Sequence, residues 1–535
     1  MAEKRAGILQ NKIYLYLTEF FAGMSVMAVE LGASRLLAPY FSSSQIVWTI
    51  IIGTIMIAMA LGNIYGGRKA DRDPDPSRLY GRMLIAALWI AGIPVLGKYI
   101  ILGISGVLVV TVNHNFLIWA AFLACMVIFV FPLFLLGTVT PSLVKYTTES
   151  LEDNGRTVGT LGAFNTVGSI IGTFVPTFVT IPAVGTAWTF LIFAGILLLL
   201  SGIYFISSHT GLGKMAVSGG MFALCCIFGG NGSFAFWETQ LTYEGESVYN
   251  YLQVKEDEEK VVLSTNVLFG VQSVMRKDDA LSGMYYDLAM AAPYMAGVHE
   301  KEKIEMLVLG MGTGTYATQC ERYFDNVEIQ GVEIDGKITG LSERYFGRDS
   351  GQQVVTYDGR AYLQAVNQKY DVIMVDAYRD ITIPFQMSSV EFFEMVKEHL
   401  TEDGVMIVNL NMKGEREGDI NAYLSDTIGR VFPDIYTADE EGSTNRELFA
   451  SKNDGILQRL EENRGREKNY DLAEMMGEVS RRLVKYTPGE YVLTDDQAPV
   501  ELLGMGMIDD LIMDEASYYR EIFKREGFRG LLDHF

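Results

Sequence analysis

Long apolar runs dominate the first 235 residues of the 535-residue chain. A helix that crosses the hydrocarbon core of a bilayer needs about 20 predominantly apolar residues. Runs of that length recur at 13–38, 46–66, 83–110, 116–140, 158–181, 186–207 and 214–231. The pattern predicts an N-terminal multi-pass α-helical membrane domain over 1–235, with about seven transmembrane helices. Gly168 and Gly172, four residues apart, have the spacing that lets two helices approach closely.

The pattern changes after residue 235. The segment 247–275 contains short alternating runs of apolar and polar residues, separated by charges and Asn. Such alternation, with a period of two, is typical of half-buried strands. We therefore expect a small antiparallel β unit and a connecting helix over 236–300.

From residue 304, short apolar runs alternate with helical patterns, which is typical of a parallel, doubly wound sheet. Strands are expected at 304–309, 327–334, 354–357, 370–375 and 405–410. Helices are expected at 315–323, 359–368, 388–399 and 419–432. The pattern predicts an α/β domain over 301–455 and a C-terminal helical extension over 456–535.

The charge is divided between the two halves. Residues 1–235 carry 13 Lys and Arg against 9 Asp and Glu, a net charge of +4. Residues 236–535 carry 30 against 56, a net charge of −26, which together with the first half gives the −22 of the chain. So acidic a half would repel nucleic acid phosphates, and it suits a small cationic substrate. It would equally well serve only to keep a domain soluble.

Three charged residues fall inside the first apolar run: Glu19, Glu30 and Arg35. An ionisable group such as Arg or Asp at mid-membrane costs about 2.5–3.5 kcal/mol unless it is paired or hydrated. We expect a partner on another helix or a water-filled cavity. A structural ion pair and a path for a cationic solute are both compatible with the sequence.

Basic residues cluster in the loop after the second run, "GRKADRDPDPSRLYGR", and near the N-terminus. Because loops rich in Lys and Arg face the cytoplasm, both segments should lie on that side. An odd number of crossings would then place the acidic half outside the cell, and an even number would place it inside. The sequence leaves this open.

The four cysteines are Cys125, Cys225, Cys226 and Cys320. They form neither a disulfide framework nor a zinc-binding spacing. No metal site is expected.

A glycine-rich turn follows the strand expected at 304–309, in "MLVLGMGTGTYATQ". Gly310, Gly312 and Gly314 would let backbone N–H groups approach a nucleotide-like ligand at the start of a helix. About twenty residues later, the next expected strand ends in Glu333, in "GVEID". A carboxylate there can accept both hydroxyl groups of a ribose.

Two aspartates follow later strands. Asp358, in "TYDGRAYL", precedes an expected helix with Gly359 in the turn. It can accept a hydrogen bond from an adenine amino group, cap the helix, or do both. Asp376, in "YDVIMVDAY", comes at the carboxyl end of a buried strand, where open α/β sheets bind their ligands. Asp376 is the candidate catalytic residue.

Taken together, these motifs make residues 244–411 resemble the spermidine synthase, or polyamine aminopropyltransferase, family. "GESVYNYLQV" resembles the entry hairpin of that family, "VLFGVQSV" the strand with a ligand-contacting glutamine, and "MYYDLA" the segment with a substrate-positioning tyrosine. The N-terminal half resembles the membrane segment fused to such domains in many bacterial proteins. "LTDDQAPVEL", with Asp495 and Asp496, is similar to a segment of these fused chains and has no role that the sequence assigns.

The resemblance implies a Rossmann-like fold of the class I methyltransferase type and transfer of an aminopropyl group from decarboxylated S-adenosylmethionine to an amine such as putrescine, releasing methylthioadenosine. It implies that Asp376 is the base, that Glu333 holds the ribose and that Asp358 holds the adenine. The implied cofactor-binding residues are Gln272, Gly310, Gly312, Thr313, Gly314, Glu333, Asp358 and Gly359. The implied substrate-binding residues are Tyr286, Asp287, Tyr378, Arg379 and Asp380.

The chain departs from the family pattern at three positions. Thr313 stands where the glycine turn of the family usually carries an aspartate that receives the amine of the aminopropyl arm. Asp287 stands in place of a histidine, and Arg379 in place of a second aspartate, with Asp380 one residue later. Thr313 with Arg379 would suit a ligand that bears a carboxylate, such as intact S-adenosylmethionine.

Two alternatives therefore stand beside the aminopropyltransferase. One is methyl or aminocarboxypropyl transfer from intact S-adenosylmethionine. The other is a nucleoside- or polyamine-sensing domain that regulates a membrane transporter. In each case we expect a multi-pass protein of the cell (inner or plasma) membrane, embedded in the lipid bilayer, with a homodimer as the family's common state.

Overall fold

The computed structural model describes residues 7–112, 114–148, 154–230, 232–267, 271–278, 281–349, 351–378, 383–411, 418–440, 442–508, 512–513, 517–518, 521–522 and 524–525. These residues fall into two compact units. The described residues of Met1–Glu238 and Glu515–Phe535 form one unit, and those of Thr239–Asp514 form the other.

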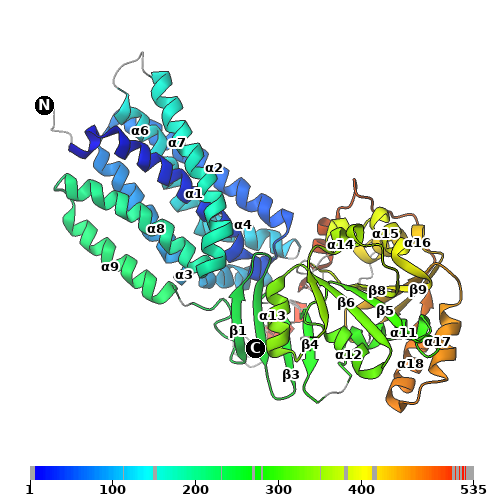
Figure 1. Ribbon diagram of the computed structural model, residues 1–535. Helices are drawn as coiled ribbons and strands as arrows, with labels where there is room; N and C mark the ends of the chain where they lie inside the picture. The colour runs from blue at the N-terminus through cyan, green and yellow to red at the C-terminus, as the bar shows by residue number, and fades with distance from the viewer. Residues whose placement is uncertain are drawn as a thin grey trace. The chain divides into compact units, whose positions relative to one another are not determined.

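The first unit is a bundle of helices (Figure 1). Its long helices are α1 (Lys12–Phe41), α2 (Gln45–Arg72), α3 (Pro76–Thr111), α7 (Asn154–Val175), α8 (Ile181–Ser207) and α9 (Leu212–Gly229). Three shorter helices lie between α3 and α7, namely α4 (Phe116–Ile128), α5 (Val130–Gly137) and α6 (Val139–Thr147). Side chains cap the starts of α2 and α3: Ser44 accepts a hydrogen bond from the backbone of Val47, and Asp75 accepts one from the backbone of Ser77.

Among the described residues, six helices are long and apolar enough to cross a membrane. Many large apolar side chains on the outside of the bundle are exposed, including Met56, Leu61 and Phe178. Because a water-soluble monomer rarely exposes so much apolar surface, these properties indicate a membrane protein.

The six helices include one continuous stretch of 54 residues, Asn154–Ser207, where the sequence led us to expect two crossings. A helix of that length would be about 80 Å long, more than twice the thickness of a bilayer core. The stretch is interrupted by a π-helical turn at Pro176–Thr180 and by Gly185, whose φ of 81° is not helical. The number of crossings stays a prediction.

Helices α1 and α7 approach each other closely, as the spacing of Gly168 and Gly172 predicted. A Cβ atom on Gly168 would lie 2.0 Å from the carbonyl oxygen of Phe20, and one on Gly172 would lie 2.2 Å from that of Met24. Both distances are far below van der Waals contact. Only glycine at these positions therefore permits the observed packing.

The second unit begins with a small antiparallel sheet of four strands, in the order β1-β2-β3-β4. The strands are β1 (Leu241–Glu246), β2 (Tyr251–Glu256), β3 (Lys260–Ser264) and β4 (Ser273–Arg276). Leu252 and Leu263 from this sheet pack with Ile338 and Leu341 of α13 (Gly336–Tyr345) in a cluster of buried side chains. The predicted small β unit is confirmed.

The larger sheet has eight strands, in the order β12-β10-β11-β9-β8-β5-β6-β7. Its parallel part consists of β5 (Ile304–Leu309), β6 (Val327–Glu333), β7 (Gln353–Thr356), β8 (Tyr370–Val375) and β9 (Leu400–Leu410). Its antiparallel part consists of β10 (Asp434–Asp439), β11 (Arg446–Ser451) and β12 (Val484–Lys485). The sheet is therefore mixed, whereas the sequence pattern predicted only its parallel strands.

Helices cover both faces of this sheet (Figure 1). One face carries α14 (Gly359–Ala365), α15 (Val390–His399) and α16 (Ile420–Val431). The other carries α11 (Ala291–Met295), α12 (Thr315–Tyr323), α17 (Ile456–Arg464) and α18 (Tyr470–Arg482). The α/β architecture predicted for the C-terminal half is confirmed.

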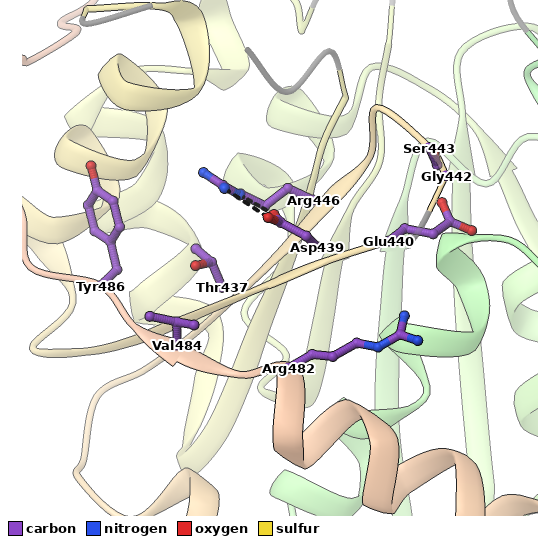
Figure 2. A pocket seen from close by; sticks show the side chains of 9 residues that line it. All are labelled: Thr437, Asp439, Glu440, Gly442, Ser443, Arg446, Arg482, Val484 and Tyr486. Carbon is purple, nitrogen blue, oxygen red and sulfur yellow. Dashed lines mark hydrogen bonds and ion pairs between the residues drawn. The ribbon is translucent and has the colours of Figure 1, made fainter. Parts of the chain in front are cut away.

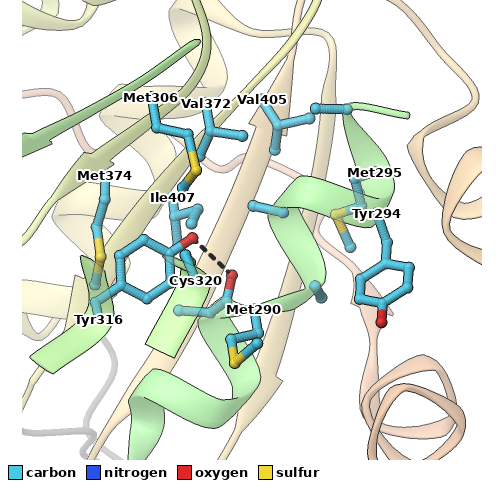
Figure 3. Packing of buried hydrophobic residues seen from close by; sticks show 14 of the residues in the cluster. Met290, Tyr294, Met295, Met306, Tyr316, Cys320, Val372, Met374, Val405 and Ile407 are labelled. Atoms are coloured by element: carbon cyan, nitrogen blue, oxygen red, sulfur yellow. Dashed lines mark hydrogen bonds between the residues drawn. The ribbon is translucent and has the colours of Figure 1, made fainter. Parts of the chain in front are cut away.

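The main core lies between the sheet and the second set of helices (Figure 3). Met374 and Ile407 project from the sheet toward Tyr316 of α12. Met290, between α10 (Tyr285–Ala289) and α11, and Met295 of α11 belong to the same core. The hydroxyl group of Tyr316 donates a hydrogen bond of 3.2 Å to the carbonyl oxygen of Ala289, which fixes α10 above this face. This core sets the positions of the side chains at the carboxyl ends of β8 and β9.

Candidate functional site

The glycine-rich turn follows β5 and leads directly into α12. Gly310, Gly312 and Gly314 all have positive φ, a conformation that other residues rarely adopt. Gly310 has a second constraint, because a Cβ atom there would lie 2.4 Å from the carbonyl oxygen of Asp376. The turn therefore packs against the backbone at the end of β8, next to the predicted catalytic residue.

Glu333 ends β6 beside this turn, and only 7% of it is exposed. Its carboxylate accepts hydrogen bonds from the backbone N–H of Gly312 at 2.8 Å and of Asp335 at 2.9 Å. Burial raises the pKa of Glu333, while these backbone donors lower it. The carboxylate thus joins the glycine turn to the turn that follows β6, and its predicted contact with a ribose stays a prediction.

Asp335 connects the small sheet to the larger one. One oxygen of its carboxylate caps α13 by accepting a hydrogen bond from the backbone N–H of Lys337. The other oxygen accepts hydrogen bonds from the Ser247 hydroxyl group at 2.5 Å and from the Asn250 amide at 3.1 Å. The entry hairpin is therefore held beside the turn that follows β6.

Asp358 follows β7 and is the N-cap of α14, where its carboxylate accepts a hydrogen bond of 2.9 Å from the backbone of Ala361. A Cβ atom on Gly359 would lie 3.2 Å from the terminal methyl group of Met387, so the helix starts in a tight space. The capping role of Asp358 is one of the two that the sequence offered. Its contact with an adenine stays a prediction.

Asp376 lies one residue past the end of β8 and is partly buried. The phenol of Tyr285 donates a hydrogen bond of 2.7 Å to Oδ2, and the amide of Asn409 donates one of 3.0 Å to Oδ1. Burial raises the pKa of Asp376 to about 7, although both hydrogen bonds lower it. A carboxyl group with this pKa is suited to exchange a proton with a ligand near neutral pH.

The segment around α10 closes one side of Asp376. The rings of Tyr285 and Tyr286 lie 4.1 Å apart, and the hydroxyl group of Tyr286 donates a hydrogen bond to the carbonyl oxygen of Gln272. Asp287 accepts hydrogen bonds from the backbone of Ser282 and Gly283 and from the side chains of Ser282 and Gln319. These four bonds give Asp287 a role in holding the loop before α10, and a role in binding a substrate stays a prediction.

Thr313 of the glycine turn and Tyr378, two residues after Asp376, are two further residues of the predicted site. Thr313 is only 1% exposed, and its hydroxyl group lies 3.2 Å from that of Thr315. The Tyr378 hydroxyl group donates to the carbonyl oxygen of Asn409 and accepts a hydrogen bond of 2.9 Å from the backbone of Asn411. Arg379 and Asp380 lie outside the described residues.

Two residues that contact Asp376 were not singled out from the sequence. Asn409 is a polar residue next to the last position of the buried strand β9, in "VNLN", a signal similar to the one that identified Asp376. Tyr285 precedes the tyrosine that the family resemblance picked out, and only the structure shows which of the two reaches the carboxylate.

The segment "LTDDQ" is tied to α14. Arg360 forms a two-pronged ion pair with Asp495, with N–O distances of 2.7 and 2.6 Å. The Ser389 hydroxyl group also donates a hydrogen bond of 2.5 Å to Asp495. Asp495 and Asp496 are both exposed. Asp495 thus holds the segment after residue 493 against the helices that follow β7 and β8.

Glu19 is the most deeply buried of the charged residues predicted within the membrane, with 0% exposure. Its Oε1 atom accepts hydrogen bonds from Thr140 of α6 at 2.6 Å and from Asn165 of α7 at 2.8 Å. Its Oε2 atom has no hydrogen-bond partner among the described residues. Glu30 and Arg35 are partly buried further along α1.

Comparisons with known proteins match the region that holds this site. The spermine/spermidine synthase domain matches residues 289–438. A probable polyamine aminopropyl transferase of Bifidobacterium longum is 52% identical over 348 residues, which cover 62% of this chain and 77% of that protein. A polyamine aminopropyltransferase of Vibrio vulnificus is 27% identical over 197 residues, which cover 35% of this chain and 64% of that protein. The solved structure of spermidine synthase from Thermotoga maritima is similar with a TM-score of 0.37 and 22% identity, covering 45% of this chain and 84% of the other.

Proposed function

Because the chain belongs to the polyamine aminopropyltransferase family, we propose that this transferase moves an aminopropyl group from decarboxylated S-adenosylmethionine to an amine such as putrescine. The single observation that carries the proposal is Asp376, a carboxyl group at the end of β8 with a pKa near 7, placed against the glycine turn. The products would be a longer polyamine and methylthioadenosine.

The reaction is a displacement at carbon. The lone pair of the acceptor nitrogen forms a bond to the aminopropyl carbon, and the bond from that carbon to the sulfonium breaks. The bonding electrons return to sulfur, which leaves as the neutral thioether of methylthioadenosine. The new ammonium group loses its surplus proton to Asp376, which therefore must be ionised before the reaction.

The donor would lie along the carboxyl ends of β5, β6 and β7. This placement is supported by the positive φ of the glycines in the turn and by the buried carboxylate of Glu333 beside them. We assign donor contacts to Gln272, Gly310, Gly312, Thr313, Gly314, Glu333, Asp358 and Gly359. We assign acceptor contacts to Tyr286, Asp287, Tyr378, Arg379 and Asp380.

Thr313 favours a second candidate for the molecule that donates the transferred group. Thr313 presents a neutral hydroxyl group in the buried part of the glycine turn, where an ammonium group on the donor would gain no charge partner from this side chain. Intact S-adenosylmethionine, which bears a carboxylate, is therefore the rival donor, with methyl or aminocarboxypropyl transfer as the reaction.

The location in the cell is the third part of the proposal. The six apolar helices support a membrane protein, and we propose the cell (inner or plasma) membrane as its location. The bilayer is thus a proposed partner, together with a small cationic amine. The side of the membrane on which catalysis occurs follows from the number of crossings.

The decisive test uses the full-length protein in nanodiscs, with putrescine and either donor, and mass spectrometry of the products. We expect spermidine and methylthioadenosine from the decarboxylated donor. Asp376→Asn should lower turnover by about 10²–10⁴-fold, because general-base catalysis contributes that much. Asp454→Asn, a change of the same type at an exposed position, should have no effect.

Calorimetry with methylthioadenosine shows whether Asp376→Asn still folds and binds. Consumption of intact S-adenosylmethionine alone would establish the rival donor. Binding without turnover by wild-type protein, with either donor, would instead favour a sensing domain over an enzyme.

A further inference from the structure

Glu447, the second residue of β11, has a buried carboxyl group that the proposed mechanism does not use. It is 0% exposed. Neither of its carboxyl oxygens has a hydrogen-bond partner among the described residues. Buried polar groups are nearly always hydrogen-bonded, so a carboxyl group with two unpartnered oxygens needs an explanation.

The strand register places Glu447 close to the site. Glu447 lies directly opposite Asn409 of β9, and the Asn409 side chain donates a hydrogen bond of 3.0 Å to Asp376. Val375, the residue before Asp376, is paired with Val408, the residue before Asn409. The three residues therefore lie side by side on adjacent strands, and about 10 Å separates the backbones of Asp376 and Glu447.

All three side chains face the same side of the sheet. Met374 lies two residues from Asp376, Ile407 two residues from Asn409, and Phe449 two residues from Glu447. These three apolar residues belong to the core under α10 and α11. Figure 3 shows Met374 and Ile407 pointing into that core. Because side chains alternate along a strand, Asp376, Asn409 and Glu447 point to this same face, at its edge below Tyr285 and Tyr286.

The opposite face of β11 holds the strand in place. Arg446 forms an ion pair with Asp439 of β10, with an N–O distance of 2.6 Å (Figure 2). Both residues line a cavity of about 640 Å³ together with Glu440, Arg482 and Tyr486. Since Arg446 and Glu447 are neighbours on one strand, they point to opposite faces. The ion pair thus fixes the hairpin, and Glu447 with it, from the side away from Asp376.

A carboxyl group in this position is costly in either protonation state. If ionised, it is a buried charge without a counter-ion, next to the negative charge of Asp376. If protonated, its O–H group has no acceptor among the described residues. Burial and the charge of Asp376 both raise the pKa of Glu447, which favours its neutral form in the free protein. A cationic ligand would supply the missing partner and favour the carboxylate.

We propose that Glu447 binds the distal ammonium group of a diamine acceptor whose other amine reacts at Asp376. This inference rests on the proposed function and deepens it, because it makes Glu447 the residue that selects a diamine over a monoamine. Two carboxyl groups on one face of three adjacent strands would hold a short aliphatic chain at both ends. Glu447 touches only the end of the acceptor that does not react.

The test compares putrescine with 1-aminobutane, which has the same carbon chain but only one amine. Full-length wild-type protein, Glu447→Gln and Glu447→Asp are measured with the donor for KM and kcat, and by calorimetry with methylthioadenosine present. We expect Glu447→Gln to raise the KM for putrescine about thirtyfold or more, as expected when a buried charge pair loses one partner. Its kinetic constants with 1-aminobutane should equal those of wild-type protein.

Glu447→Asp keeps the charge on a shorter side chain and should recover part of the affinity for putrescine. Glu474→Gln on the exposed surface of α18 is the matched control and should change nothing. Unchanged binding of methylthioadenosine shows that each variant is folded.

The outcomes separate the two proposals. If wild-type protein makes no product, the proposed function fails, and calorimetry with putrescine and 1-aminobutane still decides the role of Glu447. If wild-type protein binds putrescine no more tightly than 1-aminobutane, or Glu447→Gln binds putrescine as wild-type protein does, the inference is wrong even where turnover is normal.

Discussion

The phenolic oxygen of Tyr285 lies 2.7 Å from Oδ2 of Asp376. This hydrogen bond joins two residues 91 positions apart in the chain. It gives the proposed base a donor that stabilises its ionised form, against the burial that stabilises its neutral form. The balance between the two sets the pH at which the carboxylate becomes available.

The first prediction concerns this pH dependence. Because the pKa of Asp376 is raised to about 7 and the ionised form is the base, kcat/KM should increase as the pH rises through 7. Tyr285→Phe removes a hydrogen bond that lowers this pKa. The rising limb of the plot of kcat/KM against pH should therefore move to higher pH by about one unit. Tyr243→Phe, in the small sheet, should leave the limb in place. A limb that is identical in wild-type protein and Tyr285→Phe would contradict the assignment of Asp376 as the base.

The second prediction concerns Glu333. Glu333→Gln keeps the shape of the side chain but leaves only one acceptor oxygen for the N–H groups of Gly312 and Asp335. Leaving one buried donor unpaired should lower the free energy of unfolding by about 1–3 kcal/mol and weaken the binding of methylthioadenosine. Thermal unfolding and calorimetry measure the two effects. Glu328→Gln, an exposed position on the same strand, serves as the control, since exposed ion pairs contribute little. Equal affinity in both variants would remove Glu333 from the donor site.

The third prediction concerns the glycine turn. Gly310→Ala would place a Cβ atom 2.4 Å from the carbonyl oxygen of Asp376, at a φ of 86°. Either the turn or the end of β8 must move, so we expect loss of activity together with a lower Tm. Gly340→Ala has open space around it on helix α13 and should stabilise the protein by about 0.5–1 kcal/mol. If Gly310→Ala retained full activity, the close packing of the turn on β8 would be of no consequence for catalysis.

The fourth prediction concerns the helix bundle. Gly168→Leu would force apart α1 and α7, because even a Cβ atom there would lie 2.0 Å from the Phe20 carbonyl oxygen. Overpacking of this kind costs about 1–3 kcal/mol, so the Tm in detergent should fall. Gly162→Leu, on the same helix but with nothing within 4 Å of its Cβ position, is the control. A similar Tm for both variants would show that the α1–α7 contact does not limit stability.

Much of the fold could be predicted from the sequence. The apolar runs correspond to helices of the bundle, and strands β5 and β8 have the bounds that their apolar runs predict. The β10–β11 hairpin was missed, because its segment is rich in charged residues and resembles a loop until β9 pairs with it. Helix α13 was missed for a related reason: its apolar side chains are few, and they are buried only against the small sheet.

Within the site, the sequence by itself determined the residues that follow strands: the glycine turn, Glu333, Asp358 and Asp376. Their signals are local, because a polar or glycine residue after an apolar run is visible within ten residues. Only the tertiary structure decided that Tyr285, Asn409 and Glu447 lie around Asp376. These residues come from a helix and two strands that are brought together by sheet register and by packing on the shared core. No pattern of neighbouring residues encodes that convergence.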